Sequence, residues 1–451
     1  MRLLRHILLF FLLATSASFG ELYSIESNDG LQNILKKYNS GDTICLSNGI
    51  YSGPFDIITP LTIIGDSETI IDGKGIGDVL LLSADSITLK KLTVQNSGTR
   101  LLKDHAGIKI IGDNIKISDC LIRDNLHGIY VKGGSIINIH NNVIIGRFNI
   151  QESDRGNGIH LWNTKNNSVF NNDISFARDG IYFSFANNTE IKENHIHQLR
   201  YALHYMYSDS NSFEDNLFDY NVAGSALMFS EHISFKRNVF AFCRGMRAYG
   251  ILLQSVEYCE AYDNLILDNT KGVFYDDANH NRFENNDIIQ NDIAIHLNAS
   301  CEDNTLLNNN FISNLAEVEM HESAINLTTW SKDESGNFWS GYTGYDIDGN
   351  GVGDIPYHLQ STFEFMELDY PAIRFYLYSP AAQLLAAAEK RIPILRKTKV
   401  EDKHPLFKRL ENDNVPYDCL KEYETKSSFG HMTIWIAIFF LPMGMMWVLR
   451  K

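Results

Sequence analysis

The chain has 451 residues, a formal net charge of −16 at pH 7, and 44% hydrophobic residues. A chain this acidic offers no broad basic surface to a polyanion, which argues against nucleic acid as a partner. Its length would suffice for two or three ordinary domains, although a solenoid can reach this size without domain boundaries.

The first 20 residues have the pattern of a secretory signal peptide. Met1–His6 is short and basic, Ile7–Leu13 is apolar, and small residues follow up to Gly20. Removal of residues 1–20 would place the mature chain outside the cytoplasm, which means the periplasm in a Gram-negative cell.

Residues 21–106 are expected to form an N-terminal cap and the first coils of a repeat. Leu31–Tyr38 has a helical spacing of apolar residues, and short apolar runs such as Leu61–Ile64 and Ile87–Leu89 follow it. A helix at this place would cover the open end of a solenoid, where unpaired strand edges would otherwise face water.

Residues 107–340 repeat one pattern, in which a small residue opens a run of alternating apolar positions. Most openings are 22 residues apart; they are Gly107, Gly128, Gly158, Gly180, Ala202, Gly224, Gly250, Gly272 and Ala294. A fixed period indicates a repeat protein, and alternation with a period of two indicates strands. We therefore predict an all-β solenoid, a right-handed parallel β-helix of about twelve coils with an N-terminal cap and a C-terminal helical tail.

A second landmark keeps the same spacing and is an asparagine in every copy but the first. Its positions are Cys120, Asn142, Asn172, Asn194, Asn216, Asn238, Asn264, Asn286 and Asn310. Asparagine tolerates left-handed backbone and bonds to nearby main chain, so it suits a bend between two strands. Stacked coils would turn these residues into an internal ladder of amides, with a buried, inert thiol at Cys120. The apolar residues one and three positions after each opener should point inward.

The residues two and four positions after each opener should point outward, and they are mostly rings, imidazoles and thioethers. His204, Met206 and Met228 lie in these two columns, and neighbouring coils are about 5 Å apart. Two thioethers and an imidazole suit a soft ion such as Cu(I). These three residues are therefore candidate copper ligands.

The same face allows a second interpretation, in which an apolar and aromatic surface docks a partner protein. His160, Trp162 and Tyr182 are the candidate docking residues. The two interpretations are compatible with each other.

No catalytic residue is assigned. Glycoside hydrolysis needs two carboxylates placed across the scissile bond, but the adjacent pair Asp276 and Asp277 has Gln254 and Asn298 on the neighbouring coils. A fold alone gives no activity, so the chain is expected not to be an enzyme.

Residues 341–377 are expected to form a C-terminal capping segment with an Asp-rich loop. Asp346, Asp348, Asn350 and Asp354 have the spacing of the first ligands of a calcium loop. The twelfth position is Tyr357, so the usual bidentate glutamate is missing. A weak calcium site and a structural turn without metal both remain open.

The C-terminal part changes composition. Residues 378–430 are expected to form an alanine-rich helix and a basic linker. Residues 431–451 contain Met432–Leu449, an uncharged run of 18 residues followed by Arg450 and Lys451. This run is close to the minimum for a transmembrane helix, and a helix that only docks on a membrane partner is the alternative.

Three segments resemble the NosD family, periplasmic β-helix proteins required for the maturation of nitrous oxide reductase. They are Ala202–Ser208, Gly336–Tyr357 and Ser379–Leu385. The resemblance implies an assembly with an ABC-type membrane permease and a cytoplasmic ATPase, which hydrolyses the ATP. It also implies that the assembly supports copper delivery or cluster assembly in nitrous oxide reductase, with a copper-chaperone lipoprotein as donor.

A different class of function is compatible with the repeats alone. Many β-helices bind or modify polysaccharides, so a secreted polysaccharide-binding or polysaccharide-modifying protein is the alternative. Co-purification with a permease would favour the copper interpretation, whereas secretion without a membrane complex would favour the alternative.

Overall fold

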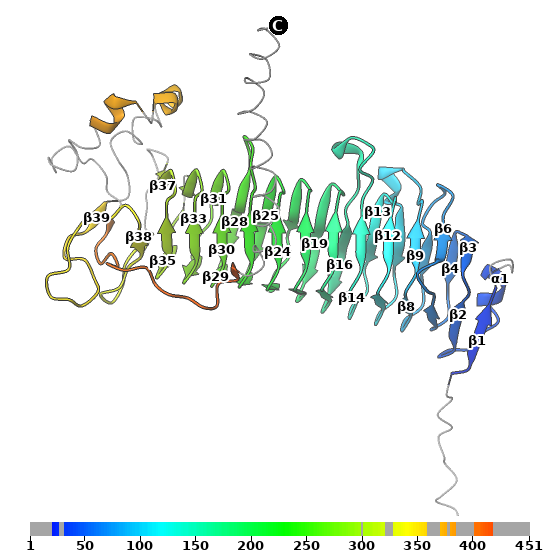
Figure 1. The fold of residues 1–451 in the computed structure, drawn as a ribbon. Coiled ribbons are helices and arrows are strands. Elements are labelled where there is room, and N and C mark those ends of the chain that lie inside the picture. The colour runs from blue at the N-terminus through cyan, green and yellow to red at the C-terminus, as the bar shows by residue number, and fades with distance from the viewer. Residues whose placement is uncertain are drawn as a thin grey trace, which may run out of the picture. The chain divides into compact units, whose positions relative to one another are not determined.

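The computed structural model describes residues 20–26, 31–298, 301–320, 328–358, 370–376, 379–384 and 401–417. The chain divides into two compact units, Met1–Asp209 and Ser210–Lys451, and each is a parallel β-helix (Figure 1). The predicted fold class is confirmed. Each coil has three strand positions. Among the described residues of both units, these positions hold 13, 12 and 13 strands, which is close to the expected number of coils.

Each coil of the first unit supplies strands to three parallel sheets, named A, B and C. Sheet A contains β1 (Leu22–Ile25), β2 (Thr43–Leu46), β5 (Thr62–Ile64), β8 (Thr88–Lys90), β11 (Lys116–Ser118), β14 (Asn138–His140), β17 (Ser168–Phe170) and β20 (Glu190–Lys192). Sheet B contains β3 (Gly49–Ser52), β6 (Thr69–Asp72), β9 (Thr93–Gln95), β12 (Leu121–Arg123), β15 (Val143–Ile145), β18 (Asp173–Ser175) and β21 (His195–His197). Sheet C contains β4 (Phe55–Ile57), β7 (Leu80–Leu82), β10 (Ala106–Ile110), β13 (His127–Lys132), β16 (Ile159–Lys165), β19 (Asp179–Asn187) and β22 (Tyr201–Met206).

Three short helices accompany these strands in the described part of the first unit. The helix expected over residues 31–38 occupies α1 (Leu31–Leu35), where Leu31 and Leu35 are buried. Two 3₁₀ helices, η1 (Leu101–Lys103) and η2 (Glu152–Asp154), lie in loops that precede strands of sheet C.

The second unit repeats the three-sheet arrangement. Its sheet A contains β23 (Ser212–Glu214), β26 (Ser234–Lys236), β29 (Glu260–Tyr262), β32 (Arg282–Glu284) and β35 (Thr305–Leu307). Its sheet B contains β24 (Leu217–Asp219), β27 (Val239–Ala241), β30 (Leu265–Leu267), β33 (Asp287–Ile289), β36 (Asn310–Ile312) and β38 (Phe338–Trp339). Its sheet C contains β25 (Ala223–Glu231), β28 (Tyr249–Glu257), β31 (Lys271–Asp276), β34 (Ile293–Leu297) and β37 (Ala316–Met320).

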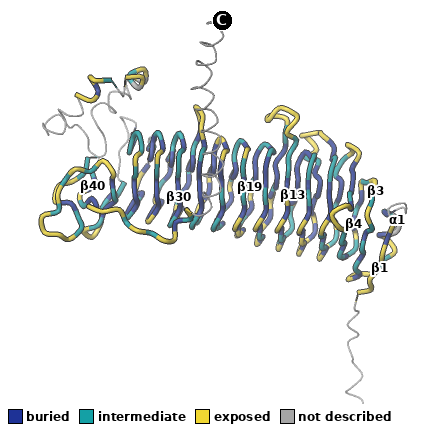
Figure 2. The backbone as a smooth tube through the Cα atoms, in the orientation of Figure 1, coloured by how far each residue is buried: buried dark blue, intermediate teal, exposed yellow. Residues whose placement is uncertain are grey.

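The interior of each unit consists of side chains stacked coil on coil. Ile129, Ile159 and Ile181 are adjacent in register on sheet C, and each is 0% exposed. Two residues after Ile181, the Phe183 ring packs against the tilted ring of Tyr205 on β22, with centroids 4.3 Å apart. Burying one such side chain stabilises the fold by about 1.5–3 kcal/mol. The predicted inward columns are confirmed, and Figure 2 shows buried residues along the strands of both units.

The first residue of each repeat must be small because adjacent coils approach each other closely at this position. A Cβ added to Gly180 would lie 2.4 Å from Cγ2 of Ile196 and 2.6 Å from the carbonyl oxygen of Ala202. The small residue at the start of each repeat therefore serves packing between coils.

The predicted asparagine ladder is present. In the first unit, Asn142 donates from Nδ2 to Oδ1 of Asn172 at 3.0 Å, and Asn172 donates in the same way to Asn194 at 2.9 Å. Cys120 precedes them as a buried thiol whose pKa is raised to about 12 by burial. The thiol is therefore protonated and unreactive, as expected.

Two details of the ladder were predicted wrongly. The left-handed residue at the corner is the one before the ladder position, such as Asn171 with φ +53°, because the ladder side chain itself must turn inward. The last ladder residues are Asn309 and Asn337 rather than Asn310. Asn310 instead donates to Oδ1 of Asp287 at 2.6 Å, because the final interval is one residue shorter than the sequence landmarks indicated.

Residues 401–417 run along the second unit (Figure 1). Oδ2 of Asp402 accepts hydrogen bonds from the backbone of Asn337 at 2.8 Å and from Nε1 of Trp339 at 2.9 Å. Farther on, Asn412 donates to Oδ1 of Asp263 at 2.8 Å. This stretch belongs to the segment expected as a helical and basic linker, and it contacts the β-helix. A two-stranded antiparallel pair joins β39 (Tyr357–His358) and β40 (Glu401–Asp402), and η3 (Pro371–Tyr376) is a 3₁₀ helix. Residues 380–384, which belong to the expected alanine-rich helix, are helical.

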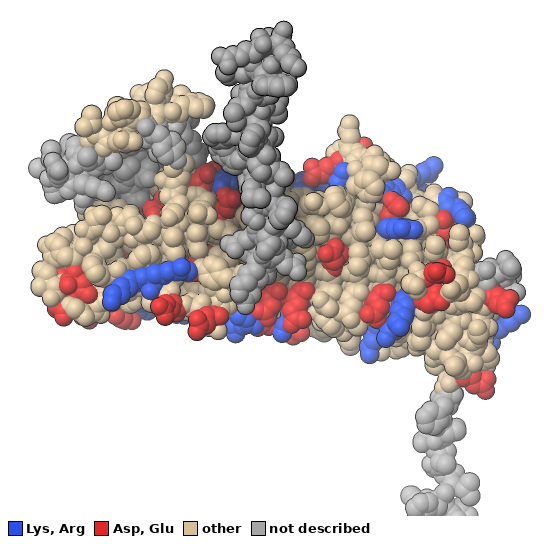
Figure 3. Space-filling view, viewed as in Figure 1, with Lys and Arg blue, Asp and Glu red and all other residues tan. Residues whose placement is uncertain are grey.

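Charged side chains of both signs are interspersed on the face seen in Figure 3. No helix in the described ranges has the length and apolar character needed to cross a lipid bilayer. The expected signal peptide, apart from Gly20, and the uncharged run Met432–Leu449 lie outside the described residues.

Candidate functional site

A row of aromatic side chains runs along the outer face of sheet C in the first unit. It consists of Tyr130, His160, Tyr182 and His204, on β13, β16, β19 and β22, and is called the ring column here. The three successive ring centroid distances are 4.5, 4.7 and 4.7 Å. The last two contacts are edge-to-face, an arrangement that aromatic pairs prefer. Strict register places one ring of the column on each coil.

The ring column is more buried than the outward positions suggested. Tyr130 is 5% exposed, and its pKa is raised to about 12, chiefly by burial. The pKa of His160 is lowered to about 3 because burial disfavours the imidazolium. Both rings are therefore uncharged at neutral pH. The other three rings of the column are partly buried. Beside the column, Asp104, which follows η1, lies 3.7 Å from the His127 imidazole.

At its other end the column meets a buried carboxylate. Asp179, only 2% exposed, receives two hydrogen bonds from the Arg200 guanidinium, at 2.9 and 2.7 Å. Nδ1 of His204 lies 2.8 Å from Oδ2 of the same carboxylate. Burial alone would raise the pKa of Asp179, but the bonds from His204 and Arg200 outweigh it and the pKa is lowered. The carboxylate is thus ionised at neutral pH.

This contact defines which nitrogen of His204 carries its proton. A carboxylate oxygen only accepts, so the 2.8 Å contact requires a hydrogen on Nδ1. In the neutral ring Nε2 then holds the lone pair, the arrangement found in metal-binding histidines supported by a carboxylate. Sequence reasoning missed Asp179, which stands directly before the opener Gly180 and was outside the columns considered.

Met206 lies two residues after His204 on the same strand and face. The Tyr182 hydroxyl donates to its sulfur at 3.6 Å. Both Met206 and His204 are partly buried. The structure therefore brings together two of the three candidate copper ligands, with Tyr182 fixing the position of the thioether.

The third candidate copper ligand, Met228, lies on β25 in the second unit. It is partly buried and adjacent in register to Gln254 on β28. The candidate set is thus divided between the two units, His204 and Met206 in one and Met228 in the other.

The candidate docking residues share the outer face of sheet C in the first unit. His160 and Trp162 are alternate residues of β16, and Tyr182 is the register partner of His160 on β19. Trp162 is 38% exposed, whereas His160 and Tyr182 are partly buried. Trp162 is therefore the most exposed of the three candidate docking residues.

The Asp-rich loop is held by bonds between its own side chains and backbone. Asp346 accepts from the backbone N–H groups of Gly349, Asn350 and Gly351 at 2.8–3.1 Å. Asp354 accepts from Ile347 at 2.7 Å, and Asp348 accepts from the Asn350 amide at 3.0 Å. These bonds are compatible with both a structural turn and a calcium loop.

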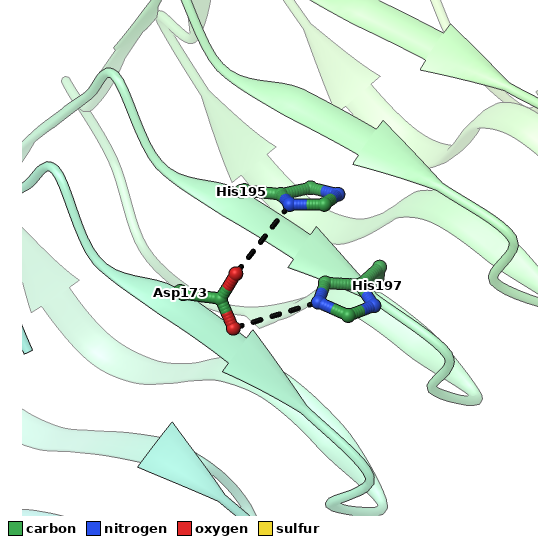
Figure 4. Close-up of side chains that lie close together, drawn as sticks. All are labelled: Asp173, His195 and His197. Atoms are coloured by element: carbon green, nitrogen blue, oxygen red, sulfur yellow. Dashed lines mark ion pairs between the residues drawn. The ribbon is translucent and has the colours of Figure 1, made fainter. Parts of the chain in front are cut away.

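The structure brings together three further groups that the sequence analysis did not consider. Asp173 on β18 and His195 and His197 on β21 offer one ligand atom each, all within 4.8 Å of one another (Figure 4). The signal was available as His-x-His at strand spacing, with an aspartate one 22-residue coil earlier. It was missed because only the outward columns of sheet C were compared.

A solenoid that holds a row of rings, an oriented imidazole and a thioether on one face belongs to the class of parallel β-helix repeat proteins. The chain is a member of the NosD family. A family model described as "Periplasmic copper-binding protein (NosD)" matches residues 146–344, which include the ring column from His160 onward. The family is thus periplasmic and copper-binding by description.

Two relatives are both described as "Probable ABC transporter binding protein NosD". The protein of Stutzerimonas stutzeri is 36% identical over 380 residues, 80% of this chain and 86% of the relative. The protein of Pseudomonas aeruginosa is 38% identical over 386 residues, which are 80% of this chain and 87% of the relative.

Among solved structures, the A-module of the Azotobacter vinelandii mannuronan C-5 epimerase AlgE6 has a TM-score of 0.52 at 12% identity, covering 69% of this chain and 94% of that one. At this low identity, the similarity to AlgE6 shows a shared fold alone.

Proposed function

We propose that the chain is a periplasmic accessory protein of an ABC-type complex that supports copper delivery or cluster assembly in nitrous oxide reductase. In this proposal a cytoplasmic ATPase hydrolyses ATP, a membrane permease connects it to the β-helix, and a copper-chaperone lipoprotein supplies copper. The chain itself acts as a platform and not as an enzyme. A signal peptide at residues 1–20 brings it to the periplasm, and residues 431–451 attach it to the membrane or to the permease.

The observation that carries the proposal is the carboxylate-supported His204 beside Met206, in a chain of a copper-binding family. Imidazole and thioether are ligands that Cu(I) accepts. Cu(I) would be cargo at this place, bound through Nε2 of His204 and the sulfur of Met206. Met228 stays the third candidate ligand, and Trp162 with the ring column is the proposed docking surface for a partner.

The Asp-rich loop supports a smaller proposal. Asp346, Asp348, Asn350 and Asp354 provide oxygen atoms of the kind Ca²⁺ prefers, although the twelfth position lacks a glutamate. We assign this loop as a candidate structural calcium site of low affinity.

The accessory function is tested in the complex. We expect the full chain, tagged and extracted in mild detergent, to co-purify with an ABC permease and ATPase. We also expect nitrous oxide reductase from a strain lacking the chain to contain less copper, measured by elemental analysis of the purified enzyme. The control is the same strain with the gene restored. Normal copper content without the chain would refute the proposal.

Direct copper binding has its own expected result. Leucine at both Met206 and Met228 should weaken Cu(I) binding by the full chain about tenfold or more, because a hydrocarbon replaces each thioether. Competition with a chromogenic Cu(I) chelator measures the change. Met246→Leu is the matched control, because Met246 is fully exposed on a loop of the second unit. If the double variant binds Cu(I) as tightly as the unaltered chain, the thioethers are not ligands.

A further inference from the structure

Asp173, His195 and His197 form a compact cluster on sheet B of the first unit. Nδ1 of His195 and Nε2 of His197 each lie 3.5 Å from an oxygen of the Asp173 carboxylate. The two imidazoles stack with centroids 4.2 Å apart and an interplanar angle of 20°. Figure 4 shows the carboxylate of β18 facing both rings of β21.

The geometry suits a single small metal ion. A transition-metal ion bonds nitrogen and oxygen ligands at about 2.0–2.2 Å, so two ligands of one tetrahedral site are about 3.3–3.5 Å apart. The observed nitrogen-to-oxygen separations of 3.5 Å are close to this value. All three ligand atoms lie within 4.8 Å of one another, and rotation of the two stacked rings would direct both nitrogens at one ion beside the carboxylate.

The backbone beneath the cluster is fixed by the fold. Asp173 pairs with His195 in register, and Ser175 pairs with His197. Between the ligands, Ile174 and Ile196 point inward and are 0% exposed. The three candidate ligands thus project outward from a rigid sheet, which lowers the entropy cost of ordering them around an ion.

The three side chains are partly buried rather than sealed. Their exposed fractions are 45% for Asp173, 32% for His195 and 20% for His197. An ion could therefore enter from solvent, and three protein ligands would leave at least one position for water or an incoming donor. This is the arrangement expected of an exchangeable site.

We propose that Asp173, His195 and His197 bind one divalent transition-metal ion, with Cu(II) preferred over Zn(II). Two imidazoles and a carboxylate favour such an ion over Ca²⁺ or Mg²⁺, which prefer oxygen ligands. For a given set of nitrogen and oxygen ligands, Cu(II) binds more tightly than Zn(II). The site lies on sheet B and contains no sulfur, so it is separate from the Cu(I) ligands proposed on sheet C and does not depend on them.

The experiment uses the full chain, stripped of metal, with Cu(II) as the probe. We expect calorimetry to show one equivalent of bound Cu(II) in the unaltered chain that is lost in the variant His195→Asn/His197→Asn. Electron paramagnetic resonance of the unaltered chain should show an axial Cu(II) signal with nitrogen hyperfine splitting. Asp173→Asn should lower the affinity of this site for Cu(II) about tenfold or more. Zn(II) should compete for the same equivalent and be displaced by Cu(II).

His140→Asn is the matched control, because His140 is also partly buried and borne on a strand of the first unit, but stacks on Phe170 at 4.7 Å. This control variant should bind the same equivalent of Cu(II) as the unaltered chain. Circular dichroism checks that each variant is folded. A double variant that keeps both the equivalent and the hyperfine pattern would overturn the proposal.

A second measurement needs no variant. Bound Zn(II) should protect His195 and His197, but not His140, from acylation by diethyl pyrocarbonate, as read by peptide mass spectrometry. Equal modification with and without Zn(II) would overturn the proposal. Both assays use divalent ions, so their failure would leave the Cu(I) chelator competition and the reductase copper content unaffected.

Discussion

Replacing Asn172 by alanine is expected to lower the free energy of unfolding of the first unit by about 3 kcal/mol or more. Oδ1 of Asn172 accepts from both the backbone N–H and Nδ2 of Asn142, each at 3.0 Å. Its own Nδ2 donates to the carbonyl of Ile139 at 3.0 Å and to Oδ1 of Asn194 at 2.9 Å. Alanine would leave these buried groups unsatisfied, and each such group costs about 1–3 kcal/mol.

Urea unfolding followed by circular dichroism measures this loss, and hydrogen exchange shows whether it is local to β14–β21. Asn171→Gly is the control, because Asn171 is the exposed neighbour with φ +53° and glycine adopts that conformation without strain. The control should change the free energy of unfolding by less than about 1 kcal/mol. Equal losses in the two variants would contradict a special role for the ladder.

The inward columns could be predicted from the sequence because the period fixes the register. Once coils are 22 residues long, a residue such as Ile159 must stack on Ile181, and alternation decides which side chains enter the core. The same logic predicted that His204 and Met206 share a face. Spacing alone was sufficient for these statements.

Burial of the outward positions could not be predicted in this way. Tyr130 is only 5% exposed. The loop containing η1 and Asp104 lies next to its neighbour His127 and does not follow the period. The partner of His204 was missed for a related reason. Asp179 is an acidic residue at a position that most repeats fill differently, and only the folded coil reveals that its carboxylate is buried under Arg200 and His204.

The cluster on sheet B shows a different limit. Asp173 and His195 are register partners, so period and alternation were enough to place them side by side. The cluster was not predicted because only the outward columns of sheet C were compared, and because β18 and β21 are only three residues long. A search of every outward column for metal-binding residue types would have found it.

The second large effect is expected at Asp179, and it separates a structural role from a role in copper binding. In Asp179→Asn the amide keeps the size of the side chain but loses the negative charge that Arg200 contacts at 2.7 Å. Removing one partner of a buried ion pair costs about 3–5 kcal/mol, and because the Arg200 side chain is 25% exposed we expect about 2–3 kcal/mol here. The variant Asp179→Asn/Arg200→Gln should recover part of this loss, because no uncompensated cation remains.

Copper binding should respond differently to the same two variants. The asparagine amide can donate to Nδ1 of His204, which moves the ring proton to Nε2 and removes the lone pair proposed to bind Cu(I). We expect Cu(I) affinity to fall about 10- to 100-fold in Asp179→Asn and not to recover when Arg200 is also replaced, as measured by chelator competition. Asp215→Asn is the matched control, since it makes the same substitution at a carboxylate of the second unit that accepts from Arg237 at 2.7 and 2.8 Å, and it should leave Cu(I) affinity unchanged. If affinity instead returns together with stability in the double variant, Asp179 supports the fold and does not orient the imidazole for copper.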